Sequence, residues 1–127
     1  MTTVAIADDH AIVRRNLRAL IEDELDLVVV GEAGSGLEAI HLVGELSPDI
    51  LVLDMILGDI TGIEATCHVR KEAPETSVII YSMYGNEDYV LGARQAGAKG
   101  YVLKESPASE LLKAIRVVSA GGRYFAT

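Results

Sequence analysis

The chain has 127 residues, a formal net charge of −8 and a pI near 4.7. This length suits one domain with a proper hydrophobic core and is too short for two ordinary ones. The acidic charge argues against direct binding to nucleic acid or to an anionic membrane, because both need a basic face. No apolar run reaches the roughly 18 residues of a membrane span, and a single cysteine excludes an internal disulfide. We therefore expect a soluble domain that works in the cytoplasm.

The first half of the chain alternates short apolar runs with longer segments of mixed polarity. The runs at Thr3–Ala7, Leu27–Ala33 and Ile50–Leu53 are rich in Val, Ile and Leu, which is typical of parallel strands covered on both faces. A helix is predicted to begin near His10. Another is predicted to follow Ser35, whose hydroxyl can cap its first turn.

The second half of the chain continues this alternation. Strands are predicted at Val78–Ser82 and Gly100–Leu103. A helix capped by Thr61 precedes the first of these strands. Between the two strands, a helix is predicted to begin at Asn86 and to stop at Gly97.

The last helix is predicted to have Ser106 as its cap and Pro107 at its first helical position. With this helix the chain contains five strand–helix units in strict alternation. Such alternation predicts an α/β fold, with right-handed crossovers and helices on both faces of a parallel sheet. We expect the flavodoxin-like, doubly wound five-stranded sheet with strand order 2-1-3-4-5. The site of such a sheet lies outside the carboxyl ends of its strands.

Acidic residues follow the first and third of these strands. The run ILVLDMILGD places one carboxylate, Asp54, in apolar sequence, which is unfavourable unless the charge has a partner. Asp8 and Asp9 follow the first strand, the neighbour of the third in the expected order. Three carboxylates in a small volume repel one another unless a proton or a cation intervenes, and oxygen ligands with open water positions suit Mg²⁺. The sequence therefore predicts a magnesium site at this edge.

A hydroxyl and an ammonium are expected at the same edge, because Ser82 ends the fourth strand and Lys104 follows the fifth. This combination suits phosphoryl transfer. Asp54 would attack phosphorus in line, Lys104 and the metal would neutralise charge, and Ser82 would donate to a phosphoryl oxygen. Each residue alone also has a structural explanation, as a helix cap, a turn residue or a surface charge. The functional interpretation rests on their meeting at the ends of four strands.

Essentially the whole sequence resembles a response-regulator receiver domain of the NarL/FixJ (LuxR-type) subfamily of two-component systems. The resemblance is carried by the motifs IADDHAIVR, DILVLDMILGDITGIE, VIIYSMY, AGAKGYVLKES and AIRVVSAGGRYF. It implies that residues 1–127 form one receiver domain. It also implies that any helix-turn-helix output domain, through which such proteins bind DNA, lies beyond the chain.

The resemblance further implies a role for each residue of the site. Asp54 would accept a phosphoryl group from the phosphohistidine of a sensor histidine kinase, and Ser82 and Lys104 would contact that group. Tyr101 would be the aromatic switch that turns inward when Ser82 moves. Mg²⁺ would be held by three carboxylates and one backbone carbonyl, those of Asp8, Asp9, Asp54 and Ile56. Phosphorylation is expected to favour a homodimer and to control an output such as transcription.

Two positions depart from the family pattern, since Gly58 and Glu105 stand where many receivers have proline. With Gly58 the loop after Asp54 is expected to be looser. The isomer of the Lys104–Glu105 peptide bond is left open.

Three other functions are alternatives. A phosphatase of the haloacid-dehalogenase type would also form an aspartyl phosphate, but it needs a second Asp where this chain has Ile56. A flavodoxin-like FMN module needs a Ser/Thr/Gly-rich loop where this chain has DDHA. The intact acidic set argues against a degenerate receiver that acts only through protein contacts. A phosphorylation switch, not a multi-turnover enzyme, is therefore expected.

Overall fold

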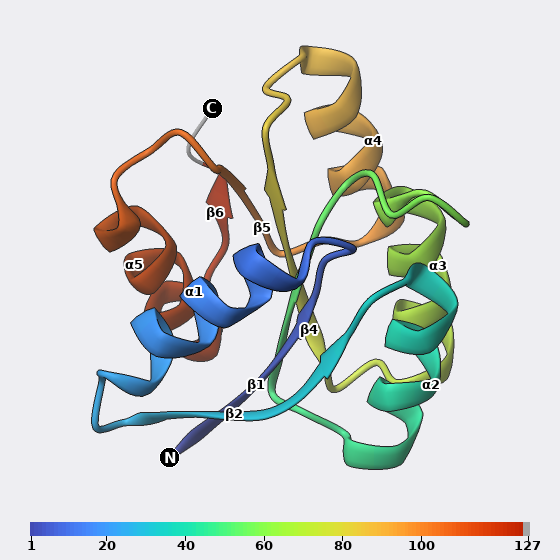
Figure 1. Cartoon of the computed structure of the whole chain (residues 1–127). Coiled ribbons are helices and arrows are strands. Elements are labelled where there is room, and N and C mark those ends of the chain that lie inside the picture. The colour runs from blue at the N-terminus through green and yellow to red at the C-terminus, as the bar shows by residue number, and fades with distance from the viewer. Residues whose placement is uncertain (126–127) are drawn as a thin grey trace.

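The computed structural model describes residues 1–125. These residues form a parallel sheet of six strands in the order β2-β1-β3-β4-β5-β6 (Figure 1). The strands are β1 Thr2–Ala7, β2 Leu27–Ala33, β3 Ile50–Leu53, β4 Ser77–Ser82, β5 Gly100–Leu103 and β6 Tyr124–Phe125. The helices are α1 Ala11–Glu22, α2 Gly36–Leu46, α3 Gly62–Glu72, α4 Glu87–Ala96 and α5 Ala108–Ser119.

The predicted α/β class and the order of the first five strands are confirmed. All strand pairs are parallel, and β1 lies between β2 and β3, so the order of the strands reverses there. Strand β6, which pairs with the first two residues of β5, is not predicted from the sequence. Two residues after a Gly-Gly pair are too few to show the period of a strand.

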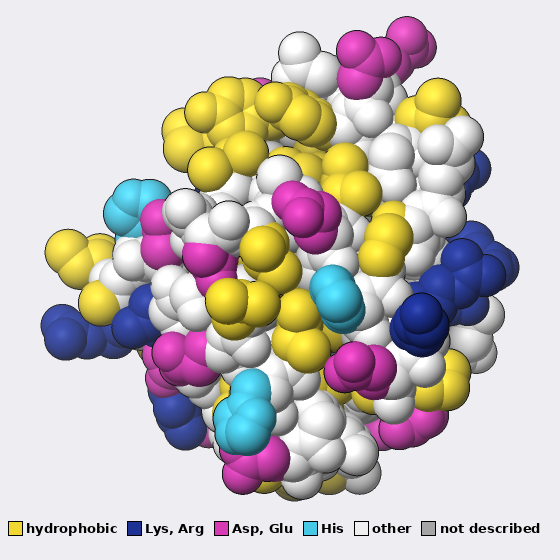
Figure 2. All heavy atoms as spheres, turned by 90° about the vertical axis from the view of Figure 1, so that its right-hand side faces the viewer, with side chains coloured by type: hydrophobic (Ala, Val, Ile, Leu, Met, Phe, Trp, Pro, Cys, Tyr) yellow, Lys and Arg dark blue, Asp and Glu magenta, His cyan; other side chains and the backbone are white. Residues whose placement is uncertain are grey.

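The helices cover both faces of the sheet, as predicted. α1 and α5 pack on one face, and α2, α3 and α4 pack on the other (Figure 1). In the view onto the α2–α4 side, Lys and Arg side chains lie toward both borders of the face, and hydrophobic, acidic and His side chains lie between them (Figure 2). No helix in the described part of the chain is long and apolar enough to cross a membrane.

Two of the predicted helix caps are confirmed. The Ser35 hydroxyl accepts the Glu38 N–H at 3.1 Å at the start of α2. At the start of α3, the Thr61 hydroxyl accepts the Glu64 N–H at 3.1 Å, and the Glu64 carboxylate accepts the Thr61 N–H at 3.2 Å. This reciprocal pair is a capping box, which satisfies two N–H groups that the helix itself leaves without partners.

The predicted start of α5 is wrong by one residue. The helix begins at Ala108, and Pro107 is its extended cap residue, with ψ of 144°. Ser106 belongs to the preceding turn, because its N–H donates to the Leu103 carbonyl at 3.1 Å. At the start of α4, Asn86 is the cap residue, but its side chain makes no cap hydrogen bond.

The two departures from the family pattern have defined backbone conformations. Gly58 has φ of 88°, which proline cannot adopt because its ring fixes φ near −65°. The glycine therefore meets a requirement of this turn. No peptide bond among residues 1–125 is cis, so the Lys104–Glu105 bond is trans.

The start of α3 lies very close to the end of β3. The Gly62 N–H donates to the Met55 carbonyl at 2.7 Å. A β-carbon on Gly62 would lie 2.6 Å from the Asp54 carbonyl oxygen and 2.9 Å from Met55 Cα. Both are backbone atoms, so any side chain at position 62 would displace the segment that carries Asp54.

We predict that Gly62→Ala lowers the free energy of unfolding by about 1 to 3 kcal/mol, because the added methyl group overpacks a backbone contact. Gly44→Ala is the matched control. Gly44 lies in α2, and a β-carbon there would meet no atom within 4 Å. Alanine at that position should raise stability by up to about 1 kcal/mol through helix propensity. Urea unfolding of both variants gives the two changes, and changes of the same sign would contradict the prediction.

Candidate functional site

Asp8 and Asp54 leave neighbouring strands at the same edge of the sheet. Ala7 of β1 pairs with Leu53 of β3, and the Asp54 N–H donates to the Ala7 carbonyl at 3.0 Å. On the other side, the Asp8 N–H donates to the Ala33 carbonyl of β2 at 3.1 Å. Asp8 is 1% exposed and Asp54 7% exposed. Two carboxylates are therefore buried side by side where the strand order reverses.

Lys104 contacts both of these carboxylates. Its Nζ lies 2.7 Å from Asp8 Oδ2 and 3.1 Å from Asp54 Oδ2. Burial raises the pKa of Asp54; Lys104 opposes this shift, and the charge of Asp8 adds to it. For Lys104, burial acts to lower the pKa, but the bonds to Asp8 and Asp54 outweigh it and the pKa is raised. The ammonium therefore stays charged and serves as a shared counter-ion.

Asp9 and His10 complete this cluster. One ligand atom from each of Asp8, Asp9, His10 and Asp54 can be chosen so that all four lie within 4.8 Å of one another. His10 Nδ1 lies 3.0 Å from Asp9 Oδ1 and 3.3 Å from Asp8 Oδ1. The carboxylates form an Asp-rich pocket, and their hard oxygen donors fit Mg²⁺. From the sequence, His10 is expected only at a helix start, because adjacency in the chain does not show where its ring points.

Ser82 and Tyr101 both contact the loop between β4 and α4. The buried Ser82 hydroxyl accepts the Tyr84 N–H at 3.0 Å. The Tyr101 ring is buried, and its hydroxyl donates to the Tyr84 carbonyl. Burial raises the pKa of Tyr101, so this hydroxyl keeps its proton. Ser82 and Tyr101, on neighbouring strands, thus hold the N–H and the carbonyl of the same residue, Tyr84. The sequence does not indicate this link.

Ile56 lies in the loop that follows Asp54. Its N–H lies 3.4 Å from Asp54 Oδ1, and its side chain is partly exposed. An antiparallel bridge to Thr61 holds the backbone of this loop. The role expected for Ile56 involves its carbonyl oxygen, so no side-chain chemistry can signal it.

Asp59 has a structural role that the sequence analysis misses. Its carboxylate accepts the N–H groups of Leu37 at 3.0 Å and of Gly36 at 2.9 Å, at the start of α2. These bonds lower the pKa of Asp59 to about 2. Asp59 therefore ties the loop after Asp54 to α2. Its partners are 22 and 23 residues away, so no local spacing reveals them.

The raised pKa of Asp54 predicts a pH-dependent difference between the native chain and Asp54→Asn. A raised carboxyl pKa contributes stability that is fully present below the ordinary value of 3.8 and is lost as pH rises through the folded-state value. Asparagine is neutral at every pH. In metal-free buffer, Asp54→Asn should therefore be the more stable protein at pH 7, and the difference should shrink as pH falls from the folded-state pKa toward 3.8 and stay constant below it. Urea unfolding across this pH range measures it, and a difference that does not change with pH would contradict the assignment.

The Tyr101 hydroxyl is predicted to stabilise the loop between β4 and α4. Tyr101→Phe removes the hydroxyl that donates to the Tyr84 carbonyl, keeps the ring, and should cost about 1 kcal/mol of unfolding free energy. Amide hydrogen exchange in the loop should become faster. Tyr89→Phe, on the partly exposed side of α4, is the control. Equal exchange rates in the loop of both variants would show that the Tyr101 bond does not hold it.

Comparison with known proteins identifies the family. The family model described as response regulator receiver domain matches residues 4–116. The transcriptional regulatory protein LiaR of Bacillus subtilis is 39% identical over 121 residues, covering 95% of this chain and 57% of LiaR. The oxygen regulatory protein NreC of Staphylococcus epidermidis is 39% identical over 123 residues, covering 95% of this chain and 56% of NreC. The chain thus spans little more than half the length of these curated relatives.

A solved structure agrees with these relatives. A LuxR-family two-component response regulator from Aurantimonas sp. SI85-9A1 is 41% identical and superposes with a TM-score of 0.94. The match covers 98% of this chain and 89% of that one. Fold, site geometry and relatives agree: the chain belongs to the response regulator receiver domains, as a receiver of the LuxR/NarL type.

Proposed function

We propose that this receiver domain is a phosphorylation switch that accepts a phosphoryl group on Asp54 from a sensor histidine kinase in a Mg²⁺-dependent reaction. One observation carries the proposal: the Lys104 ammonium lies 3.1 Å from Asp54 and 2.7 Å from Asp8. Asp9 lies in the same cluster. A nucleophilic carboxylate, a fixed cation and further carboxylates for a metal are the parts that phosphoryl transfer needs.

In the proposed reaction an oxygen of ionised Asp54 attacks phosphorus in line. The new O–P bond forms an acyl phosphate, while the P–N bond of the donor phosphohistidine breaks and its electron pair returns to the imidazole. Lys104 stands where it can neutralise charge on the phosphoryl oxygens. The Ile56 N–H orients the carboxylate from 3.4 Å. Mg²⁺, bound by the three carboxylates and the Ile56 carbonyl, would add further charge neutralisation.

The switch would work through Ser82 and Tyr101. Ser82 uses its oxygen to accept the Tyr84 N–H, which leaves its hydroxyl hydrogen free to donate to a phosphoryl oxygen. The phosphoryl group brings close to two negative charges. A shift of Ser82 toward it would change the hold on Tyr84, whose carbonyl is also the partner of the Tyr101 hydroxyl. The loop that leads into α4 is therefore the element that the proposal expects to change.

The proposed control of transcription is carried out by a part of the protein other than this domain. LiaR is named as a transcriptional regulatory protein, and this chain spans 57% of its length. We propose that residues 1–127 are the receiver unit of a cytoplasmic protein whose DNA contacts belong to a separate helix-turn-helix domain. The net charge of −8 supports this division, because DNA binding needs a basic face. Phosphorylation is proposed to favour a homodimer, which light scattering of the phosphorylated chain would detect.

The site favours a switch over the alternatives. Ile56 stands where an aspartyl-phosphate phosphatase needs a general acid. We therefore propose that the domain catalyses only its own phosphorylation and dephosphorylation. A degenerate receiver has no need for a buried ammonium against its acceptor carboxylate. The contact between Lys104 and Asp54 therefore supports a working phosphoacceptor.

The test is intact mass after incubation with acetyl phosphate and Mg²⁺. We expect the native chain to gain one phosphoryl group and Asp54→Asn to gain none. Asp88→Asn, an exposed carboxylate in the first turn of α4, is the matched control and should be phosphorylated like the native chain. Chelation of Mg²⁺ should abolish the gain.

Two outcomes would contradict the proposal. Phosphorylation that persists in Asp54→Asn would place the acceptor elsewhere. A folded native chain that binds Mg²⁺ but gains no phosphoryl group from acetyl phosphate or from a histidine kinase would favour the degenerate receiver.

A further inference from the structure

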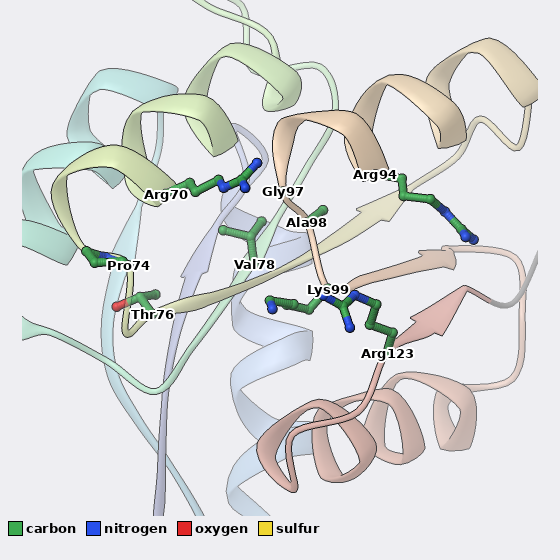
Figure 3. Close-up of a pocket in the computed structure, with 9 residues that line it drawn as sticks. All are labelled: Arg70, Pro74, Thr76, Val78, Arg94, Gly97, Ala98, Lys99 and Arg123. Carbon is green, nitrogen blue, oxygen red and sulfur yellow. The ribbon is translucent and has the colours of Figure 1, made fainter.

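A cationic cavity of about 280 Å³ lies at the amino ends of β4 and β5 (Figure 3). It is lined by Thr76 just before β4, Val78 in β4 and Lys99 just before β5. The acidic cluster lies beyond the carboxyl ends of the parallel strands, so the two sites are separated by the length of the sheet. The residues of the proposed switch do not line this cavity.

The cavity concentrates positive charge on an acidic protein. Four of the eleven Lys and Arg residues of the chain line it, and no Asp or Glu does. These four are Arg70, Arg94, Lys99 and Arg123. Within residues 1–125, none of them forms a salt bridge, whereas Arg14, Arg18, Lys104 and Arg116 do. Like charges that share a cavity repel one another unless an anion lies between them.

The backbone of the cavity wall is fixed. The Lys99 N–H donates to the Val78 carbonyl at 2.8 Å, and the Lys99 carbonyl accepts the Tyr124 N–H at 2.9 Å. The stem of Arg70 lies across Gly97, where a β-carbon would come within 2.4 Å of Arg70 Cδ. Gly97 has φ of 106° and ends α4, so the close approach of Arg70 uses a position that already requires glycine.

Arg94 is set apart from the other cations of the cavity. Its guanidinium lies 4.1 Å from the centre of the Phe125 ring, and its side chain extends away from Arg70 in the close-up view (Figure 3). A cation on an aromatic face is already partly stabilised. Within residues 1–125, Arg70, Lys99 and Arg123 are therefore the cations of this cavity that lie on no aromatic ring.

Helix electrostatics explain only part of this arrangement. Arg70 and Arg94 lie in the last turns of α3 and α4, where a positive charge favours the helix dipole. Lys99 and Arg123 lie outside the helices and gain nothing from it. The helix dipole therefore does not explain why these two residues line the same cavity.

We propose that this cavity binds a small phosphorylated anion, at a site separate from the phosphoacceptor. Guanidinium groups match phosphate oxygens in a bidentate geometry, and lysine adds a point charge. The cavity volume of about 280 Å³ is close to the lower end of the roughly 300–1,000 Å³ of small-ligand pockets, and its lining residues come from α3, α4, β4 and the segments before β4, β5 and β6. A nucleic acid backbone is a poorer fit, because the net charge of −8 repels a long polyanion.

Titration with pyrophosphate tests the proposal. The chain is labelled with ¹⁵N and titrated at constant ionic strength in Mg²⁺-free buffer, so that no metal links the anion to the carboxylates. We expect saturable amide shifts centred on residues 97–99, with a dissociation constant of about 1 mM or lower. Arg70→Gln and Arg123→Gln should each weaken binding by about tenfold.

Arg15→Gln is the matched control, because it removes the same charge from the exposed side of α1. It should leave binding unchanged. Thermal unfolding shows whether each variant is folded, and both cavity substitutions replace exposed side chains. Shifts that do not saturate, shifts centred on Lys104, or equal weakening by Arg15→Gln would each overturn the proposal. These outcomes are independent of whether Asp54 is phosphorylated.

Discussion

The functional edge of this domain depends on one ammonium between two buried carboxylates. Asp8 and Asp54 are almost fully excluded from solvent, and Lys104 contacts both. A buried carboxylate without a partner is strongly destabilising, so the three groups form one unit. Lys104 reaches this unit only because β5 ends beside β4, and Asp8 and Asp54 meet only because β1 and β3 pair in register. The order of the strands therefore determines the chemistry.

The surrounding structure fixes Asp54, the proposed acceptor, through its backbone. The segment after Asp54 is held by the close approach of Gly62, by the bridge between Ile56 and Thr61, and by the Asp59 carboxylate at the start of α2. The loop after Ser82 is instead held by two hydrogen bonds at Tyr84, one from its N–H to the Ser82 hydroxyl and one from the Tyr101 hydroxyl to its carbonyl. A rigid proposed acceptor lies beside a loop with few restraints, and a change of charge at such a site can shift the conformation of the loop.

Much of the fold could be predicted from the sequence because its signals are local. Continuous apolar runs gave the five longer strands, and Ser35 and Thr61 marked two helix starts by their capping chemistry. The carboxylates and Lys104 could be placed at one edge because topology alone brings the ends of parallel strands together. The predicted start of α5 was wrong by one residue, because a helix cap and the turn before it use the same residue types, here Ser106 and Pro107.

The rest could not be predicted because it depends on contacts distant in the sequence. The partners of Asp59 lie on another helix, and the orientation of His10 depends on the packing of two neighbouring carboxylates. The cationic cavity draws its charges from residues spread between positions 70 and 123, each ordinary in its own segment. Such a site becomes visible only when α3, α4 and β6 are assembled.

The short strand β6 has a consequence for the behaviour of the domain as a separate molecule. By pairing with Gly100 and Tyr101 it covers the first half of β5, which would otherwise be the open border of the sheet. An uncovered strand offers unpaired N–H and C=O groups to other chains and is a template for aggregation. A shortened protein that ends before Tyr124 would expose this border. By covering this border, Tyr124 and Phe125 thus protect the domain against aggregation as well as completing the sheet.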